Sequence, residues 1–292
     1  EEMFAKFFVP RCEVAVVNEA NGWRKHPEIA ERHGFAVEVL PTPFGYDLAV
    51  LALKSAVSLR RGNATTVSGF HHGVLHAVVA GEENQVVHVL ATHLSPKSAL
   101  KRRDEARQLI AIVQRLESRD NAAVAVAGDL NTLSPLDRAD HGSLLPILRA
   151  NPRLMAKFLV TPDRESPIDY LPMKILLADL VDVAYEHASS KAAKPHTTVP
   201  TLLHADKLHA APMRLDYVLL NARAAAVLLD PNGRAVHVST LLDDYTHRAS
   251  DHYPLVVDLP SGRAAEDKPP PSDDDSAAAE WASSSSSSSS SS

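Results

Sequence analysis

Short apolar runs, separated by turn residues, make up most of the chain. Runs of about four to eight apolar residues bounded by Gly, Pro, Asn or Asp are typical of β-strands. They predict strands over residues 12–18, 35–40, 46–53, 73–79, 86–92, 122–127, 215–220 and 253–259. Two further strands, 224–229 and 235–239, are predicted around Asp230-Pro231-Asn232-Gly233, because this sequence is typical of a hairpin turn.

Helical periodicity occurs at fewer places. It is clearest over residues 98–119, where apolar residues follow one helix face and Ser98 stands at the N-cap position. Shorter helices are predicted over 27–34, 144–158 and 168–177, with Asn151-Pro152 interrupting the 144–158 segment. Because strands outnumber helices and most connections are hairpin-like, we predict an α+β fold, a two-sheet and largely antiparallel β-sandwich flanked by helices.

The end of the chain differs in composition from the rest. It is rich in Pro, Asp and Ser, and it closes with a run of serines from Ser283 to Ser292. Such a stretch has almost no apolar surface to bury, so burial cannot offset the entropy cost of ordering it. We therefore predict one domain over residues 1–260 and a disordered acidic, Pro-rich and polyserine tail over residues 261–292.

Charge and cysteine content exclude some classes of protein. The formal net charge is -6 and the tail supplies much of it, so the body lacks the basic surface that dominates affinity for duplex DNA. The single cysteine, Cys12, excludes an internal disulfide. The sequence contains no apolar run of about 18 residues, so we do not expect an integral membrane protein. No signal peptide is visible at the start. The compartment stays undetermined, and we expect a monomer.

Five strands end in residues that can bind a metal ion or move a proton. The segments are Val17-Asn18-Glu19, Thr92-His93-Leu94, Gly128-Asp129-Leu130-Asn131, Arg214-Leu215-Asp216-Tyr217 and Ser250-Asp251-His252-Tyr253-Pro254-Leu255. Taken singly, most have a structural explanation, since Asp129 and Asn131 could close a turn. Asp216 is different, because a carboxylate in a buried strand needs a partner such as an imidazole or Arg214.

Together and in this order, the segments resemble the motifs of the endonuclease/exonuclease/phosphatase superfamily. The resemblance extends over residues 19–259, nearly all of the predicted domain. It implies a four-layer αββα, deoxyribonuclease-like fold. It also implies a hydrolase of phosphate esters, with phosphodiesterase as the favoured activity. It also implies Mg²⁺ as cofactor, with Mn²⁺ as the alternative. The substrate class stays open between nucleic acid, phospholipid and small phosphoester.

The resemblance implies that four of these residues bind the metal ion and activate water. Glu19 and Asp251 match metal-binding carboxylates, which suits Mg²⁺ because this ion prefers oxygen ligands and takes only one or two protein carboxylates. His252 matches the general base, and Asp216 matches the carboxylate that orients its ring. A carboxylate on one ring nitrogen fixes the tautomer and stabilises the imidazolium that forms when the other nitrogen takes a proton.

The remaining matched residues would contact the phosphate. Asp129 and Asn131 match the pair that positions the nucleophile and the phosphate oxygens. His93 matches a histidine that contacts the phosphate and protonates the leaving oxygen. For the adjacent pair His71-His72, we favour a solvated turn over a place in the substrate cleft.

One feature departs from the family pattern. There, a core strand ending in a metal-site asparagine precedes the strand that carries the glutamate. Here the only asparagine before Glu19 is Asn18, which lies in the wrong strand. We therefore expect an N-terminally truncated domain that lacks its first strand. An alternative function follows, a catalytically impaired or non-enzymatic binding protein on the same fold.

Overall fold

The computed structural model describes residues 12–259 except 82–84, 160–167, 192, 204–211, 230–234 and 236, together with Glu2, Lys6, Phe8 and Val9. Residues Glu1–Pro260 group into one compact unit. The predicted tail and the predicted hairpin turn lie outside the described residues, so the domain boundary stays a prediction. In the described part of the chain, no helix has the length and apolar character needed to cross a bilayer.

Strands and helices alternate along the chain. The strands are β1 (Val14–Val17), β2 (Phe35–Leu40), β3 (Leu48–Leu53), β4 (Ser58–Arg61), β5 (Val74–Ala80), β6 (Val86–Thr92), β7 (Ala123–Asp129), β8 (Leu180–Asp182), β9 (Asp216–Asn221), β10 (His237–Thr240) and β11 (Leu255–Asp258). The α-helices are α1 (Pro27–Arg32), α2 (Ala99–Asp120), α3 (Leu144–Ala150), α4 (Pro152–Phe158), α5 (Leu171–Leu176), α6 (Val183–Ser190), α7 (Ala222–Leu228) and α8 (Thr246–Ala249).

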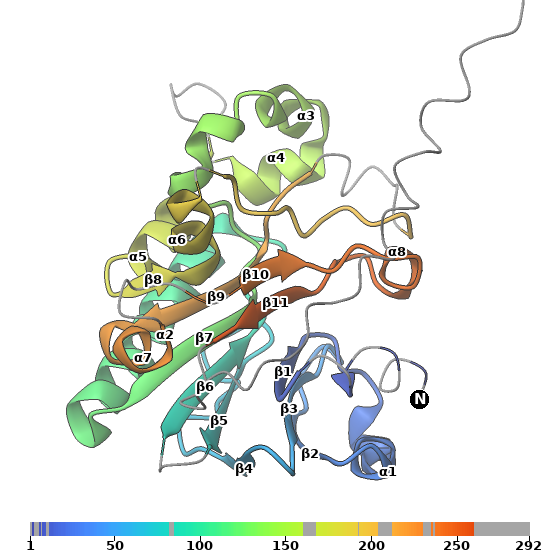
Figure 1. Ribbon diagram of the computed structural model, residues 1–292. Coiled ribbons are helices and arrows are strands. Elements are labelled where there is room, and N and C mark those ends of the chain that lie inside the picture. The colour runs from blue at the N-terminus through green and yellow to red at the C-terminus, as the bar shows by residue number, and fades with distance from the viewer. Residues whose placement is uncertain are drawn as a thin grey trace, which may run out of the picture. The chain divides into compact units, whose positions relative to one another are not determined.

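A six-stranded sheet in the order β4-β5-β6-β7-β9-β8 forms the centre of the molecule (Figure 1). All its neighbouring strands are antiparallel except β6 and β7. A parallel pair needs a crossover connection, and α2 supplies it here. Two smaller antiparallel sheets, β1-β3-β2 and β10-β11, complete the strand pairing.

The layers follow from the apolar faces of these sheets. Helices α2 and α5 pack on one face of the six-stranded sheet, around Leu90, Val126 and Leu219. Both small sheets pack on the opposite face, where Val89 contacts the β1-β3-β2 cluster and Ala125 contacts the β10-β11 cluster. Helix α1 covers the outer side of β1-β3-β2. The predicted α+β sandwich is thus confirmed, with two separate sheets forming the second β layer.

One prediction on the 224–239 region is wrong. Residues 224–228 belong to helix α7 rather than to a strand, and β10 pairs with β11 instead of forming a hairpin with that segment. The local sequence explains the helix. Four of the five residues from 222 to 226 are alanine, the best helix former, and the Asn221 side chain caps the helix by accepting a hydrogen bond from the Ala224 backbone amide.

Candidate functional site

The ends of four strands meet at one edge of the sandwich. Since β6 and β7 are parallel, His93 after β6 and Asp129 at the end of β7 lie at the same edge. Antiparallel β9 begins there, with Asp216 directly opposite Asp129. The pKa of Glu19, which follows β1, responds to the charges of His93, Asp251, His252 and Asp129, so this carboxylate lies beside the same cluster. The expected convergence of distant segments is therefore present.

His252 and Asp216 form a hydrogen-bonded pair. The His252 Nδ1 atom lies 2.7 Å from Asp216 Oδ2. Thr198 ties the two segments together, because its Oγ1 accepts from the Asp216 amide (3.3 Å) and its carbonyl oxygen accepts from the Tyr253 amide (2.8 Å). Burial opposes protonation of His252, but the carboxylates of Asp216, Asp129 and Asp251 outweigh it and raise the pKa of His252 to about 10. Arg214, the other partner considered for Asp216, instead binds Asp137 and Asp182.

Asp129 lies between two imidazoles. Its Oδ2 atom is 3.3 Å from His93 Nε2 and 4.0 Å from His252 Nε2, while its Oδ1 accepts a 2.7 Å hydrogen bond from the Asn131 amide. Burial alone would raise the pKa of Asp129, but the hydrogen bond from His93 and the charges of both imidazoles lower it below its ordinary value. Asp129 is therefore an anion that can orient both rings.

The backbone around Asp129 adopts conformations that few residues tolerate. Gly128 has φ 137°, and a Cβ atom there would lie 2.0 Å from the Thr92 carbonyl oxygen, so only glycine allows β6 and β7 to approach this closely. Asn131 has φ 49° and its Nδ2 donates to the Leu94 carbonyl oxygen at 3.0 Å. Glu19 has φ 55°. Such conformations persist where the surrounding contacts fix them, and they cluster at functional sites.

Glu19 and Asp251 are the candidate metal ligands. Partial burial raises the pKa of Glu19, the imidazoles of His93 and His252 lower it, and the carboxylates of Asp251 and Asp129 raise it again. A cation would relieve this repulsion between carboxylates. In the described part of the chain, no three His, Cys, Asp or Glu side chains are placed to hold an ion together. Two carboxylates with water and substrate oxygens are the usual set for Mg²⁺, so the residues present fit that ion.

His72 and Lys157 were missed by sequence reasoning. His72 lies in no solvated turn: only 1% of it is exposed, its ring stacks on His93 at 4.2 Å, and neither ring nitrogen has a hydrogen-bond partner among the described residues. Burial and the neighbouring His93 lower the pKa of His72 to about 3. Burial lowers the pKa of Lys157 in α4. The charges of Asp129, Asp216 and Asp251 raise the same pKa, so this lysine lies near three acidic site residues. Neither residue belongs to a recognisable motif.

The loops that carry the histidines are held by a buried glutamate of α2. Glu105 is fully buried, and its two oxygens accept from the backbone amides of His71 (2.6 Å) and Ser95 (2.7 Å). Beyond them, Phe44 is 57% exposed and stacks on the His71 ring at 4.4 Å. An aromatic wall therefore leads from His93 through His72 and His71 to the surface at Phe44.

Solved structures of similar fold were found, whereas no family model and no curated protein matches the chain. An AP endonuclease from Leishmania major is 17% identical, with a TM-score of 0.58 over 88% of this chain and 79% of that one. ANGEL2, a 2',3'-cyclic phosphatase, is 15% identical, with a TM-score of 0.55 over 88% and 82%. A humanized D. rerio TDP2 is 16% identical, with a TM-score of 0.53 over 85% and 86%. The chain shares the fold of these structures, an α+β sandwich of the kind that the resemblance of its five segments implied.

Proposed function

We propose that this protein is a divalent-metal-dependent hydrolase of phosphate esters, acting as a phosphodiesterase with His252 as general base. The observation that carries the proposal is the Asp216–His252–Asp129 arrangement, in which one carboxylate holds Nδ1 at 2.7 Å and another lies 4.0 Å from Nε2. Glu19 and Asp251 beside it supply the oxygen ligands that Mg²⁺ or Mn²⁺ prefers. The fold shared with a 2',3'-cyclic phosphatase and an AP endonuclease supports the same reaction class.

The proposal gives each of these side chains a task. Asp216 accepts a hydrogen bond from Nδ1–H of His252, which leaves Nε2 free to remove a proton from an attacking water. Asp129 and Asn131 orient that water and a phosphate oxygen. His93, whose Nε2 lies by Asp129, delivers a proton to the leaving oxygen. A cation bound by Glu19 and Asp251 would offset the charge that develops on the phosphoryl oxygens.

His252 must be neutral to act as a base. The three carboxylates around it favour its charged form and raise its pKa to about 10. Positive charge held by Glu19 and Asp251 acts in the opposite direction, because like charges repel. A cation bound there would therefore favour the neutral form of His252 that the proposal requires.

Turnover of bis(p-nitrophenyl) phosphate, measured against Mg²⁺ concentration and after EDTA treatment, tests the proposal. We expect metal-dependent hydrolysis that falls by about 100-fold or more in His252→Ala. The matched control is His237→Ala, which removes an exposed histidine of β10 and should leave the rate unchanged. Equal rates in the two variants would contradict the role of His252. Complete absence of metal-dependent turnover would instead favour the non-enzymatic binding protein.

A further inference from the structure

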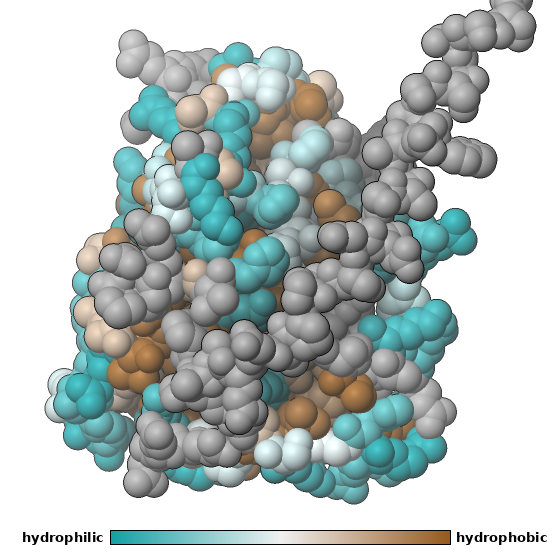
Figure 2. All heavy atoms as spheres, viewed as in Figure 1, coloured by the Kyte–Doolittle hydropathy of each residue, from teal (hydrophilic) through white to brown (hydrophobic). Residues whose placement is uncertain are grey.

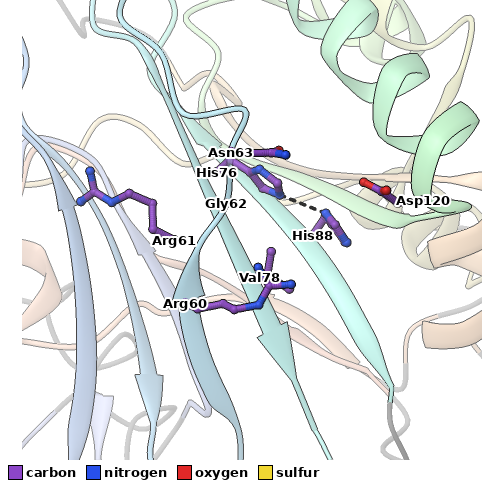
Figure 3. Close-up of a pocket in the computed structure, with 8 residues that line it drawn as sticks. All are labelled: Arg60, Arg61, Gly62, Asn63, His76, Val78, His88 and Asp120. Atoms are coloured by element: carbon purple, nitrogen blue, oxygen red, sulfur yellow. Dashed lines mark hydrogen bonds between the residues drawn. The ribbon is translucent and has the colours of Figure 1, made fainter.

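A polar cavity lies away from the functional site, and no residue of that site lines it. It has a volume of about 320 Å³ and is bounded by β4, β5, β6 and the last residue of α2. Its charged and polar lining residues are Arg60, Arg61, Asn63, His76, His88 and Asp120 (Figure 3). None of them has a task in the phosphoesterase proposal.

His76 is held in one orientation and one tautomer. Only 1% of it is exposed, and its Nδ1 accepts a 3.1 Å hydrogen bond from the Ala64 backbone amide. The ring packs so closely on Gly62 that a Cβ atom at that position would lie 2.0 Å from Nδ1. Because Nδ1 accepts, the proton of the neutral ring is on Nε2, which lies 3.0 Å from His88 Nδ1.

This proton fixes the tautomer of His88 in turn. His88 Nδ1 accepts from His76, so the neutral His88 ring carries its proton on Nε2. Both rings are neutral near pH 7, since burial and the neighbouring His88 and Arg60 lower the pKa of His76 to about 4, and burial lowers the pKa of His88. The pair therefore presents a fixed N–H donor at the cavity.

The charged groups around this donor have opposite signs. Arg60 makes no hydrogen bond or ion pair with any residue that the structure describes, whereas Arg61 is bound to Glu38 Oε2 (2.8 Å) and the Val39 carbonyl oxygen (2.7 Å) and points away from the cavity (Figure 3). Asp120 faces the cavity from the end of α2. The cavity thus combines a cation, an N–H donor and a carboxylate that accepts hydrogen bonds.

We propose that this cavity binds a phosphate group that retains one proton, as inorganic phosphate or as a phosphomonoester. Its anionic oxygens would accept hydrogen bonds from the Arg60 guanidinium and His88 Nε2–H. Its P–OH would donate to Asp120, whose negative charge repels an oxyanion that has no proton to give. Sulfate and phosphodiesters lack that proton. The site is independent of the phosphoesterase proposal.

The test is an NMR titration of the full chain in EDTA, followed on the ring resonances of His76 and His88. Assignment uses His88→Asn, which removes one set of signals. We expect inorganic phosphate and methyl phosphate to shift both rings with dissociation constants on the order of 1 mM or below. The ligand that binds more tightly shows whether the site takes inorganic phosphate or a phosphomonoester. Sulfate and dimethyl phosphate should produce no saturable shift.

Variants separate this site from general attraction of anions. Arg60→Ala should weaken phosphate binding by about tenfold or more, because it removes a charged hydrogen-bond donor. Arg61→Ala, the neighbouring residue with the same charge, is the matched control and should retain affinity within about twofold. Asp120→Asn should allow sulfate to bind. Equal binding of sulfate and phosphate by the unchanged protein, equal losses in both arginine variants, or no shift with phosphate would each overturn the proposal.

Discussion

Two hydrogen-bonded pairs, one of histidine with aspartate and one of two histidines, lie in different parts of the same sandwich. At the functional site, His252 Nδ1 lies 2.7 Å from a carboxylate oxygen of Asp216. In the polar cavity, His76 Nε2 lies 3.0 Å from Nδ1 of His88. The geometry is similar, yet the pKa of His252 is raised to about 10 and that of His76 is lowered to about 4.

The charge of the surroundings explains the opposite shifts. Burial lowers the pKa of both histidines, because it disfavours the charged ring. Around His252, three carboxylates outweigh burial. Around His76, His88 and Arg60 add to the effect of burial, and Asp120 opposes it only in part. The carboxylates therefore favour the charged form of His252, while the neighbouring imidazole and guanidinium groups favour the neutral form of His76.

Among the variants that test this contrast, Asp216→Asn should produce the largest effect, a loss of activity. It keeps the shape of the side chain but removes the carboxylate on His252 Nδ1, which fixes the tautomer and stabilises the imidazolium. We expect kcat for metal-dependent phosphodiester hydrolysis to fall by about 1,000-fold, or about 4 kcal/mol in activation free energy. Asp104→Asn, on the exposed side of α2, is the control and should leave kcat unchanged. A loss below tenfold would mean that the pair does not act in catalysis.

His76→Asn should change how stability depends on pH. The pKa of His76 is about 4 in the folded protein and 6.5 when unperturbed, so the unfolded chain binds more protons between these values. The stability contributed by the neutral ring is thus complete above pH 6.5 and is lost as pH falls toward 4, by about 3 kcal/mol.

The asparagine can still accept from the Ala64 amide but cannot be protonated. The free energy of unfolding, measured in urea, should fall between pH 7 and pH 4 in both proteins. This fall should be smaller by about 3 kcal/mol in the variant than in the unchanged protein. The variant should keep the part of the pH-dependent loss of stability that comes from His72, because the pKa of His72 is lowered to about 3. An identical decrease in both proteins would contradict the assigned protonation of His76.

The sequence predicts the fold well where periodicity is strong. β2 and β6 have the predicted bounds, and α2 differs by one residue at each end. The prediction is wrong at 224–229 because the turn sequence after it outweighed an alanine-rich stretch. The short strand β8 and helix α6 were not predicted, because each is too short or too weakly periodic to be distinguished from a loop.

The functional site was predicted only as far as it lies in motifs. Five predicted site residues each lie at or near the end of a strand, so their convergence could be inferred before any coordinates. These residues are Glu19, His93, Asp129, Asp216 and His252. The contacts of Glu105 and Lys157 could not. Both lie on helices whose polar residues look like ordinary solvated positions, and only tertiary packing brings them to the loops around Asp129.

His88→Asp should have a smaller effect, a change in the pKa of His76. It tests the contrast most directly, because it gives His76 the kind of partner that His252 has. It places a carboxylate where His76 now meets an imidazole, and so copies the partner of His252. We expect the pKa of His76 to rise by about one unit, or about 1.4 kcal/mol, in an NMR titration of its ring. His88→Asn is the matched control, because it has the same shape without charge, and the pKa of His76 should stay below its value in His88→Asp. If both variants give the same pKa, burial rather than the charge of the partner determines the protonation of His76. The contrast with His252 would then reflect depth in the fold and not the choice of neighbour.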